Sequence, residues 1–146
     1  MIKRVLEPNI ASECDKLLSK LIAFEQKFDS LSKPLIVENY FANCIESESN
    51  ILMAAMVDDK VVGFAYFKAI VNNEVYGYLL DCIYVLDEYR HQGLASNLIE
   101  EGLKIVLTHP IKFVDVKCFY DNDNACMLYQ KYGFKPYKVL LRKIVD

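Results

Sequence analysis

A strand, a tight turn and a helix follow one another in the middle of the chain and limit the folds it can adopt. Val75–Leu86 is mostly apolar and predicts a strand, and Tyr89–Ile99 leads through a turn at Gly93 into a helix. Phe113–Tyr120 then alternates apolar and polar residues, which predicts another strand. Because strands joined by a crossover helix run in the same direction, this unit requires a parallel pair in the sheet.

The turn before this helix has the features of an anion site. The first N–H groups of a helix lack partners within it and lie at the positive end of its dipole. A turn with a single glycine, Gly93, exposes several such groups together, which suits a phosphate. Its sequence matches neither a P-loop nor a Rossmann fingerprint, so nucleotide binding of either kind is not expected. A helix start without a ligand stays open as an alternative at this point.

The remaining elements predict one α/β (α+β) domain over residues 1–146. Strands are expected at Ile2–Leu6, Ile51–Val57, Val61–Val71 and Tyr137–Ile144, and helices at Ile10–Phe28, Val37–Ile45, Ser96–Leu107 and Asn124–Tyr132. Short connections at Asp58–Lys60 and Asn72–Asn73 make the strands between residues 51 and 86 an antiparallel meander. The expected sheet is therefore mixed and largely antiparallel, and about four helices flank it.

Composition and charge exclude several classes of protein. The net charge is only −3 and no basic cluster occurs, so nucleic acid is not an expected partner. No apolar stretch reaches membrane-spanning length, and Glu7 and Pro8 interrupt any signal-peptide core, so no membrane contact is expected. Five cysteines without C-x-x-C spacing predict reduced thiols in a cytoplasmic protein. With two histidines and no Cys/His cluster, no metal site is expected.

A second motif follows the predicted parallel strand. Residues 124–134 read NAxxLYxxxGF, and residues 90–95 in the first turn read RxxGxA. Together they resemble the two signatures of the GNAT superfamily of acetyl-CoA-dependent N-acetyltransferases, Q/R-x-x-G-x-G/A and N-A-x-x-L-Y-x-x-x-G-F. The order of elements also agrees with that family over nearly the whole chain. The resemblance implies a GNAT-like three-layer fold in which the two parallel strands splay apart, and acetyl-CoA as the cosubstrate.

The resemblance also implies where acetyl-CoA binds. In the family the strand before the loop carries a bulge, and the pantetheine arm lies in the resulting cleft like an added strand. Its partners here would be the backbone groups of Ile83, Tyr84 and Val85. The pyrophosphate would lie on the N–H groups of His91, Gln92, Gly93, Leu94, Ala95 and Ser96.

Three polar side chains would also take part in this binding, and two of them have a second interpretation. Arg90 would add positive charge beside the pyrophosphate. Asn124 would bond to the pantetheine arm, or it caps a helix. Lys131 would reach the ribose 3′-phosphate, or it is a solvated surface residue.

The implied reaction is acetyl transfer to a primary amine of a small molecule or peptide by direct attack in a ternary complex. A backbone N–H of Ile83 or Val85 would polarise the thioester carbonyl. Tyr129 occupies the position of the family's general acid, although it is also readily explained as a packed aromatic residue.

The general base is less defined by the sequence. Asp81 and Glu74 are the candidate carboxylates, and solvated strand ends are the favoured alternative. Cys82 raises a covalent acetyl-cysteine mechanism, which is disfavoured because no neighbouring histidine would activate it.

The acceptor is expected to enter over the two N-terminal helices, between Phe24 and Tyr40, where Glu25 and the acidic loop Glu46–Glu48 would attract a cationic amine. A homodimer through the sheet edge or the C-terminal strand is also expected to be possible. Two alternatives to an enzyme stay open: a catalytically silent CoA-binding or regulatory module, and an α/β partner domain without CoA.

Overall fold

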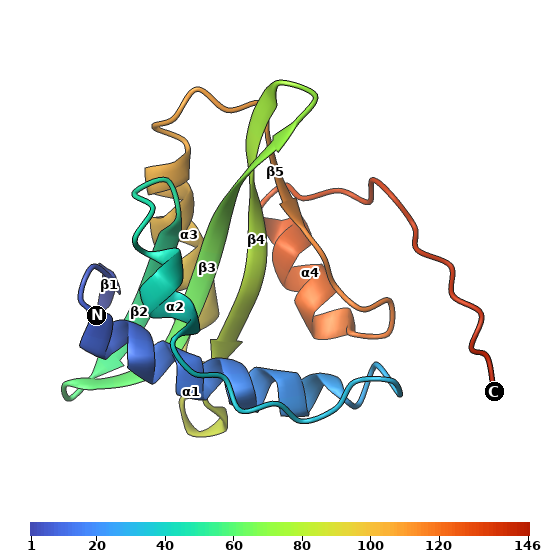
Figure 1. The fold of residues 1–146 in the computed structure, drawn as a ribbon, viewed down its shortest axis with the longest axis horizontal. Coiled ribbons are helices and arrows are strands. Elements are labelled where there is room, and N and C mark those ends of the chain that lie inside the picture. Colours follow the sequence, from blue (N-terminus) through green and yellow to red (C-terminus); the bar gives the residue numbers. More distant parts are fainter.

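The computed structural model describes residues 1–146 as one sheet with helices packed against it (Figure 1). The elements follow in the order β1 (Ile2–Arg4), α1 (Pro8–Glu25), α2 (Tyr40–Cys44), β2 (Ile51–Val57), β3 (Lys60–Asn72), β4 (Val75–Val85), a 3-10 turn (Asp87–Tyr89), α3 (Leu94–Val106), β5 (Phe113–Val116) and α4 (Asp123–Lys131).

The sheet has the order β1-β2-β3-β4-β5, and every neighbouring pair is antiparallel except β4 and β5. In Figure 1, α1 and α2 cover one face and α3 covers the other, while α4 stands beside β5. The predicted three-layer fold, with its mixed sheet, parallel pair and four helices, is confirmed.

The helix α3 packs directly against a ring on the sheet because one of its buried positions is a glycine. Leu98, Ile99 and Val106 recur at helical spacing and are fully buried, which gives the helix its apolar face. At Gly102 a side-chain Cβ would collide with the ring of Phe67 on β3. The absent side chain therefore lets the helix rest directly on that ring, and it fixes where the loop before α3 is held.

A buried carboxylate joins the two N-terminal helices. Asp15 is the only charged residue in the core, and its Oδ1 accepts a hydrogen bond of 3.0 Å from the backbone N–H of Phe41. Phe41 is the second residue of α2, where a backbone N–H has no partner within the helix. The bond therefore satisfies both groups and fixes α2 against α1.

Helix boundaries differ from the sequence expectations by one or two residues in α3 (Leu94–Val106) and α4 (Asp123–Lys131), and by more in α1 and α2. α1 begins at Pro8 rather than Ile10, because proline is favoured in the first turn, and it ends at Glu25 rather than Phe28. α2 is five residues long instead of the predicted Val37–Ile45, since Asn39 before it has a left-handed φ of 55° that no helix contains. The two hairpin turns contain consecutive left-handed residues, and the second turn is centred on Asn73–Glu74 rather than Asn72–Asn73.

The predicted last strand, Tyr137–Ile144, is not formed. These residues have no strand neighbour and run away from the sheet as an extended tail (Figure 1). The apolar side chains of the tail are largely exposed, Leu140 to 80% and Leu141 to 88%. Its polar contact with the rest of the chain is an Arg142 Nη1–Asp29 Oδ1 pair at 3.7 Å. The residue pattern favours β structure, but a strand needs a partner for its backbone groups, and the tail has none.

The strand β5 is also shorter than predicted, ending at Val116 instead of Tyr120. Since β4 is its only neighbour in the sheet, β5 is an edge strand with one side unpaired. None of the helices combines the length and apolar character that a membrane crossing requires.

Candidate functional site

A bulge interrupts β4 at Asp81. Along the β3–β4 ladder, Tyr66 pairs with Cys82 and the next residue, Phe67, pairs with Leu80. Asp81 is therefore an extra residue on β4 with no partner on β3. An extra residue bends a strand and increases its twist. The bulge thus lies at the point from which β4 diverges.

The pairing between β4 and β5 ends at the same level. Four parallel pairs run from Gly77–Phe113 to Leu80–Val116, and the ladder then stops. β4 continues for five more residues to Val85 while still paired with β3 on its other side. Ile83, Tyr84 and Val85 lie beyond the end of β5, so they have no strand beside them on that side of β4. An unpaired stretch of strand next to a paired one provides the donors and acceptors for an added extended chain.

The loop between β4 and α3 presents six consecutive unpaired N–H groups. None of the backbone N–H groups from His91 to Ser96 donates to a backbone carbonyl; the first that does is that of Asn97, which donates to the Gly93 carbonyl at 3.0 Å. His91 and Gly93 both have left-handed φ values, 62° and 81°. Alternating left-handed and ordinary residues make a concave group of N–H donors, which binds anions. The loop predicted before α3 is therefore present, and these N–H groups have no backbone partner.

Gly93 is the residue that the loop conformation requires. Its φ of +81° is strained for any residue with a side chain, while no atom lies within 4 Å of where a Cβ would stand. The glycine is thus needed for its backbone conformation and for an open approach to the N–H groups, not to make room inside the protein.

Arg90 holds the end of β4 rather than projecting over the loop. Its Nε donates to the Val85 carbonyl at 2.8 Å, and its Nη1 pairs with Asp87 Oδ1 at 2.7 Å. The guanidinium group also lies 5.1 Å from the ring centre of Phe24 and 5.2 Å from that of Tyr84. These contacts join α1, β4 and the loop, a role that the sequence motif alone does not reveal.

The beginning of α4 separates the two interpretations of Asn124. The helix cap is Asn122, whose Oδ1 accepts from the N–H of Ala125 at 3.3 Å. Asn124 is exposed and its side chain makes no hydrogen bond, so it is available to a ligand. Lys131, at the end of the helix, is also exposed, with its Nζ 5.6 Å from the ring centre of Tyr132.

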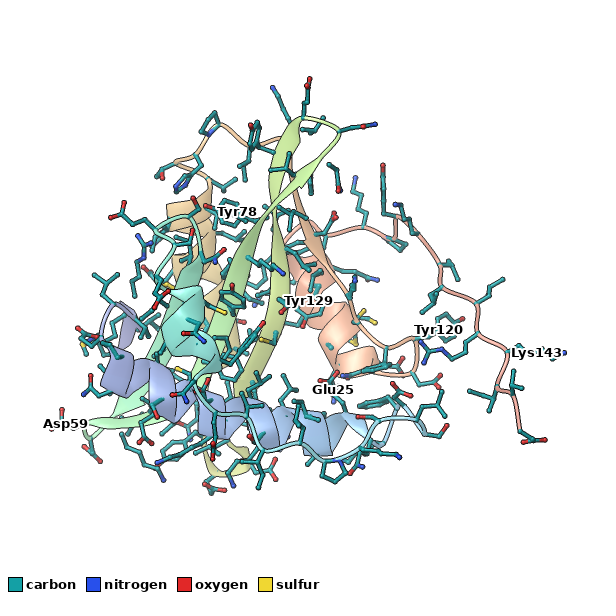
Figure 2. The ribbon with its side chains drawn as sticks, in the orientation of Figure 1. Glu25, Asp59, Tyr78, Tyr120, Tyr129 and Lys143 are labelled. Atoms are coloured by element: carbon teal, nitrogen blue, oxygen red, sulfur yellow. The ribbon has the colours of Figure 1, made fainter.

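Tyr129 lies on the buried side of α4 and retains its proton. Figure 2 shows it on α4, with Glu25 on α1 below. Its ring packs edge-on against Phe134 at 6.1 Å, and 7% of the residue is exposed. Burial raises the pKa of its hydroxyl, and the nearby thiols of Cys118 and Cys126 raise it further. A tyrosine in this environment is protonated at neutral pH.

Burial favours the protonated forms of Glu25 and Cys82, two side chains beside the bulge. Burial raises the pKa of Glu25, and the charges of Asp29 and Asp81 add to that effect. Burial raises the pKa of the Cys82 thiol strongly, with Asp81 next in importance. A protonated thiol is a poor nucleophile, so the environment of Cys82 disfavours the acetyl-cysteine mechanism.

Glu74 does not belong to the site. It lies in the β3–β4 turn, nine residues before Ile83 on an extended strand, and that separation corresponds to about 30 Å. Asp81, in contrast, stands at the bulge, one residue before Cys82.

Tyr66 and Cys44 are two neighbours of the site that sequence reasoning missed. Burial raises the pKa of the Tyr66 hydroxyl, and a hydrogen bond with Cys44 raises it further. Tyr66 pairs with Cys82 across the β3–β4 ladder. The meander predicted from the sequence placed these strands together, but only the register identifies this pair.

Comparisons with known proteins agree with this geometry. The sequence profile of the acetyltransferase (GNAT) family matches residues 17–134. The N-alpha-acetyltransferase of Saccharolobus solfataricus is 31% identical over 104 residues, which cover 56% of this chain and 62% of that protein. The chain therefore spans less than two thirds of the length of this curated relative.

Solved structures share the fold. A mutant of the BH1408 protein from Bacillus halodurans has a TM-score of 0.88 at 12% identity, over 100% of this chain and 99% of that one. The aminoglycoside N-acetyltransferase AAC(6')-Iy in complex with CoA has a TM-score of 0.75 at 16% identity, over 100% of both chains. The ribosomal-protein-alanine N-acetyltransferase from Brucella melitensis has a TM-score of 0.70 at 18% identity, over 99% of both chains. At these identities the likeness is one of fold.

Proposed function

We propose that this chain, which belongs to the acetyltransferase (GNAT) family, moves an acetyl group from acetyl-CoA to a primary amine by direct attack in a ternary complex. The observation that carries the proposal is the run of free N–H groups from His91 to Ser96 beside the unpaired end of β4. The N–H groups suit a pyrophosphate, and the strand edge suits an amide-containing arm. Acetyl-CoA carries both on one molecule.

The binding roles follow from the positions of the groups. The pantetheine arm would lie along the free edge of β4 at Ile83, Tyr84 and Val85. The side chain of Asn124, which makes no hydrogen bond within the protein, would reach the arm from α4. The pyrophosphate would lie on the loop N–H groups. Because Asp87 offsets much of its charge, Arg90 would act mainly by holding the loop in shape. Lys131 is proposed to meet the 3′-phosphate.

Acetyl transfer requires stabilisation of an oxyanion and protonation of the leaving sulfur. A backbone N–H of Ile83 or Val85 would donate to the carbonyl oxygen as the amine attacks the carbonyl carbon. As the C–S bond breaks, Tyr129 would give its proton to the sulfur. Its raised pKa keeps that proton in place until then, and such general acid help is worth roughly 10²–10⁴-fold.

The acceptor amine must be neutral to attack and must lose a proton to become an amide, so that proton also has to be removed. We propose Asp81 as the acceptor of that proton through water, because the bulge places an exposed carboxylate next to the free strand edge. Glu25 lies close enough for the charge of Asp81 to raise its pKa. The two carboxyl groups together would favour a cationic amine.

The acceptor is proposed to enter where the end of α1 faces the start of α4. Phe28, just after α1, stacks on Phe119 in the loop before α4 at 5.9 Å between ring centres. Glu25, the last residue of α1, lies about one turn before Phe28. The relative named an N-alpha-acetyltransferase supports an amine as the acceptor, either on a peptide or on a small molecule.

We also propose a domain organisation, a location and an oligomeric state. Residues 1–146 would act as a single N-acetyltransferase domain, supported by the single sheet that all five strands share. A cytoplasmic location is supported by the five free cysteines. A homodimer is supported by the open edge of β5 and the exposed apolar tail from Tyr137 to Val145. Light scattering on the full chain and on a chain shortened to Pro136 tests the dimer.

An acceptor-amine screen with detection of released CoA tests the function. The CoA is to be separated by chromatography, because the five free cysteines of the protein also react with thiol reagents. Acceptor-dependent release of CoA supports the proposal. Acetyl-CoA at 100 times its Kd should also stabilise the fold by about 2.7 kcal/mol. Stabilisation without turnover of any amine would favour a silent CoA-binding module, and no stabilisation would refute CoA binding.

A further inference from the structure

Two cysteine sulfurs from different elements touch beside α4. The Sγ atoms of Cys118, in the loop after β5, and Cys126, in the first turns of α4, are 2.9 Å apart. This is well inside ordinary non-bonded contact between sulfur atoms, although the two residues are free thiols. A disulfide bond of about 2.0 Å therefore needs only a small approach of the two side chains.

The backbone around the pair is held by its own hydrogen bonds. The N–H of Asn122 donates to the Phe119 carbonyl at 2.9 Å, and the N–H of Cys126 donates to the Asn122 carbonyl at 3.0 Å. The ring of Phe119 is further fixed by stacking on Phe28. The loop that carries Cys118 and the helix turn that carries Cys126 are thus both held in place, and the contact between the sulfurs follows from the fold.

Cys118 differs from the other four cysteines in being exposed, so an oxidant in solution reaches its sulfur. Its partner Cys126 is half-buried, as are Cys44 and Cys82, but only Cys126 lies in contact with the exposed thiol. Cys14 is fully buried and burial raises its pKa to about 12, and burial also raises the pKa of Cys82 strongly. An exposed thiol in contact with a second thiol is the arrangement in which oxidation gives a disulfide.

We propose that Cys118 and Cys126 form a reversible dithiol–disulfide site, oxidised by a peroxide. The Cys118 thiolate attacks one peroxide oxygen, the O–O bond breaks, and the leaving hydroxide takes up a proton to become water. The resulting sulfenic acid is attacked by the Cys126 sulfur, the S–O bond breaks, and a second water leaves with the proton of that thiol. Two thiols are oxidised, one peroxide is reduced, and the bond closes the loop from residue 118 to residue 126.

The reaction is expected to be slow near neutral pH. Burial raises the pKa of the Cys118 thiol to about 11, and its contact with Cys126 adds to this effect. Because the thiolate is the reactive form, the site is suited to stoichiometric oxidation by excess peroxide and not to rapid peroxide turnover. The experiment is therefore best run at mildly alkaline pH.

The test compares reduced full-length protein with the same protein after hydrogen peroxide at pH 8.5. The thiol titre should fall from five to three, and peptide mapping should find Cys118 linked to Cys126. Closing so short a loop should raise Tm by about 5–10 °C, and dithiothreitol should reverse the rise. None of these three readouts involves acetyl-CoA, so the result does not depend on the proposed enzymatic function.

Single substitutions provide the matched controls. Cys118→Ser and Cys126→Ser should each abolish both the linked peptide and the rise in Tm, whereas Cys44→Ser should retain them. A wild-type protein that keeps five thiols would overturn the proposal. So would a map that links another pair, or one that finds Cys118 carrying added oxygen without a link. The map of the wild-type protein decides the matter even where a variant fails to fold.

Discussion

Replacement of Gly93 by alanine separates the stability of the loop from its proposed binding role. Gly93 has a φ of +81°, and no atom lies within 4 Å of where the new Cβ would stand. The cost of the substitution is therefore the left-handed backbone conformation alone, about 1–2 kcal/mol. For a chain of this size such a loss lowers Tm by about 3–8 °C.

Gly133 offers a closely matched control. It has a φ of +89° at the end of α4, again with nothing within 4 Å of a Cβ. Gly133→Ala should thus lose about the same 1–2 kcal/mol in a urea titration. The two variants differ in place: Gly93 lies among the N–H groups proposed to bind the pyrophosphate, and Gly133 does not.

The two variants should therefore differ in their affinity for acetyl-CoA. Losing one hydrogen bond to a charged group costs about 1.5–3 kcal/mol, so Gly93→Ala should weaken binding by roughly 10- to 150-fold. Gly133→Ala should bind within about twofold of wild type. Isothermal titration calorimetry below the Tm of both variants makes the comparison. Equal affinities for the two variants would refute the role given to the loop.

Three other substitutions test separate parts of the account. Tyr129→Phe should lower kcat by roughly 10²–10⁴-fold with little change in acetyl-CoA affinity; an unchanged kcat in steady-state kinetics would remove Tyr129 from the mechanism. Glu25→Gln should raise Tm at pH 7, because the raised pKa of Glu25 means that its ionised form is disfavoured by folding. This gain in Tm should shrink as the pH falls below the folded-state pKa of Glu25, where the wild-type side chain is protonated. Thermal melts across pH 4–8 in which the difference in Tm does not change would contradict this prediction. Gly102→Ala should destabilise the fold by about 1–3 kcal/mol, because the new methyl group meets Phe67; urea unfolding without loss would show that α3 moves aside freely.

Local sequence patterns were sufficient where one segment determines its own conformation. The apolar run of β4, the glycine in the turn and the periodicity of α3 predicted the parallel pair and the anion loop. For the loop and for α3 the deciding interactions lie within a few residues of one another, and the parallel direction of β4 and β5 follows from the crossover helix between them.

The sequence was insufficient where the outcome depends on a partner elsewhere in the chain. Tyr137–Ile144 has strong β-forming residues, yet it finds no strand beside it and stays extended. Arg90 carries the motif's positive charge, but its position depends on Phe24, Tyr84 and Asp87. No sequence rule places the bulge at Asp81, since that follows from the register between β3 and β4.

Amide hydrogen exchange with and without CoA tests the central claim most directly. The N–H groups of His91 to Ser96 lack backbone partners and should exchange rapidly in the free protein. Saturating CoA should slow exchange in this run and along Ile83–Val85, while the tail from Val139 to Arg142 stays unchanged. Binding of CoA that leaves residues 91–96 unprotected, or that protects another surface instead, would contradict the account.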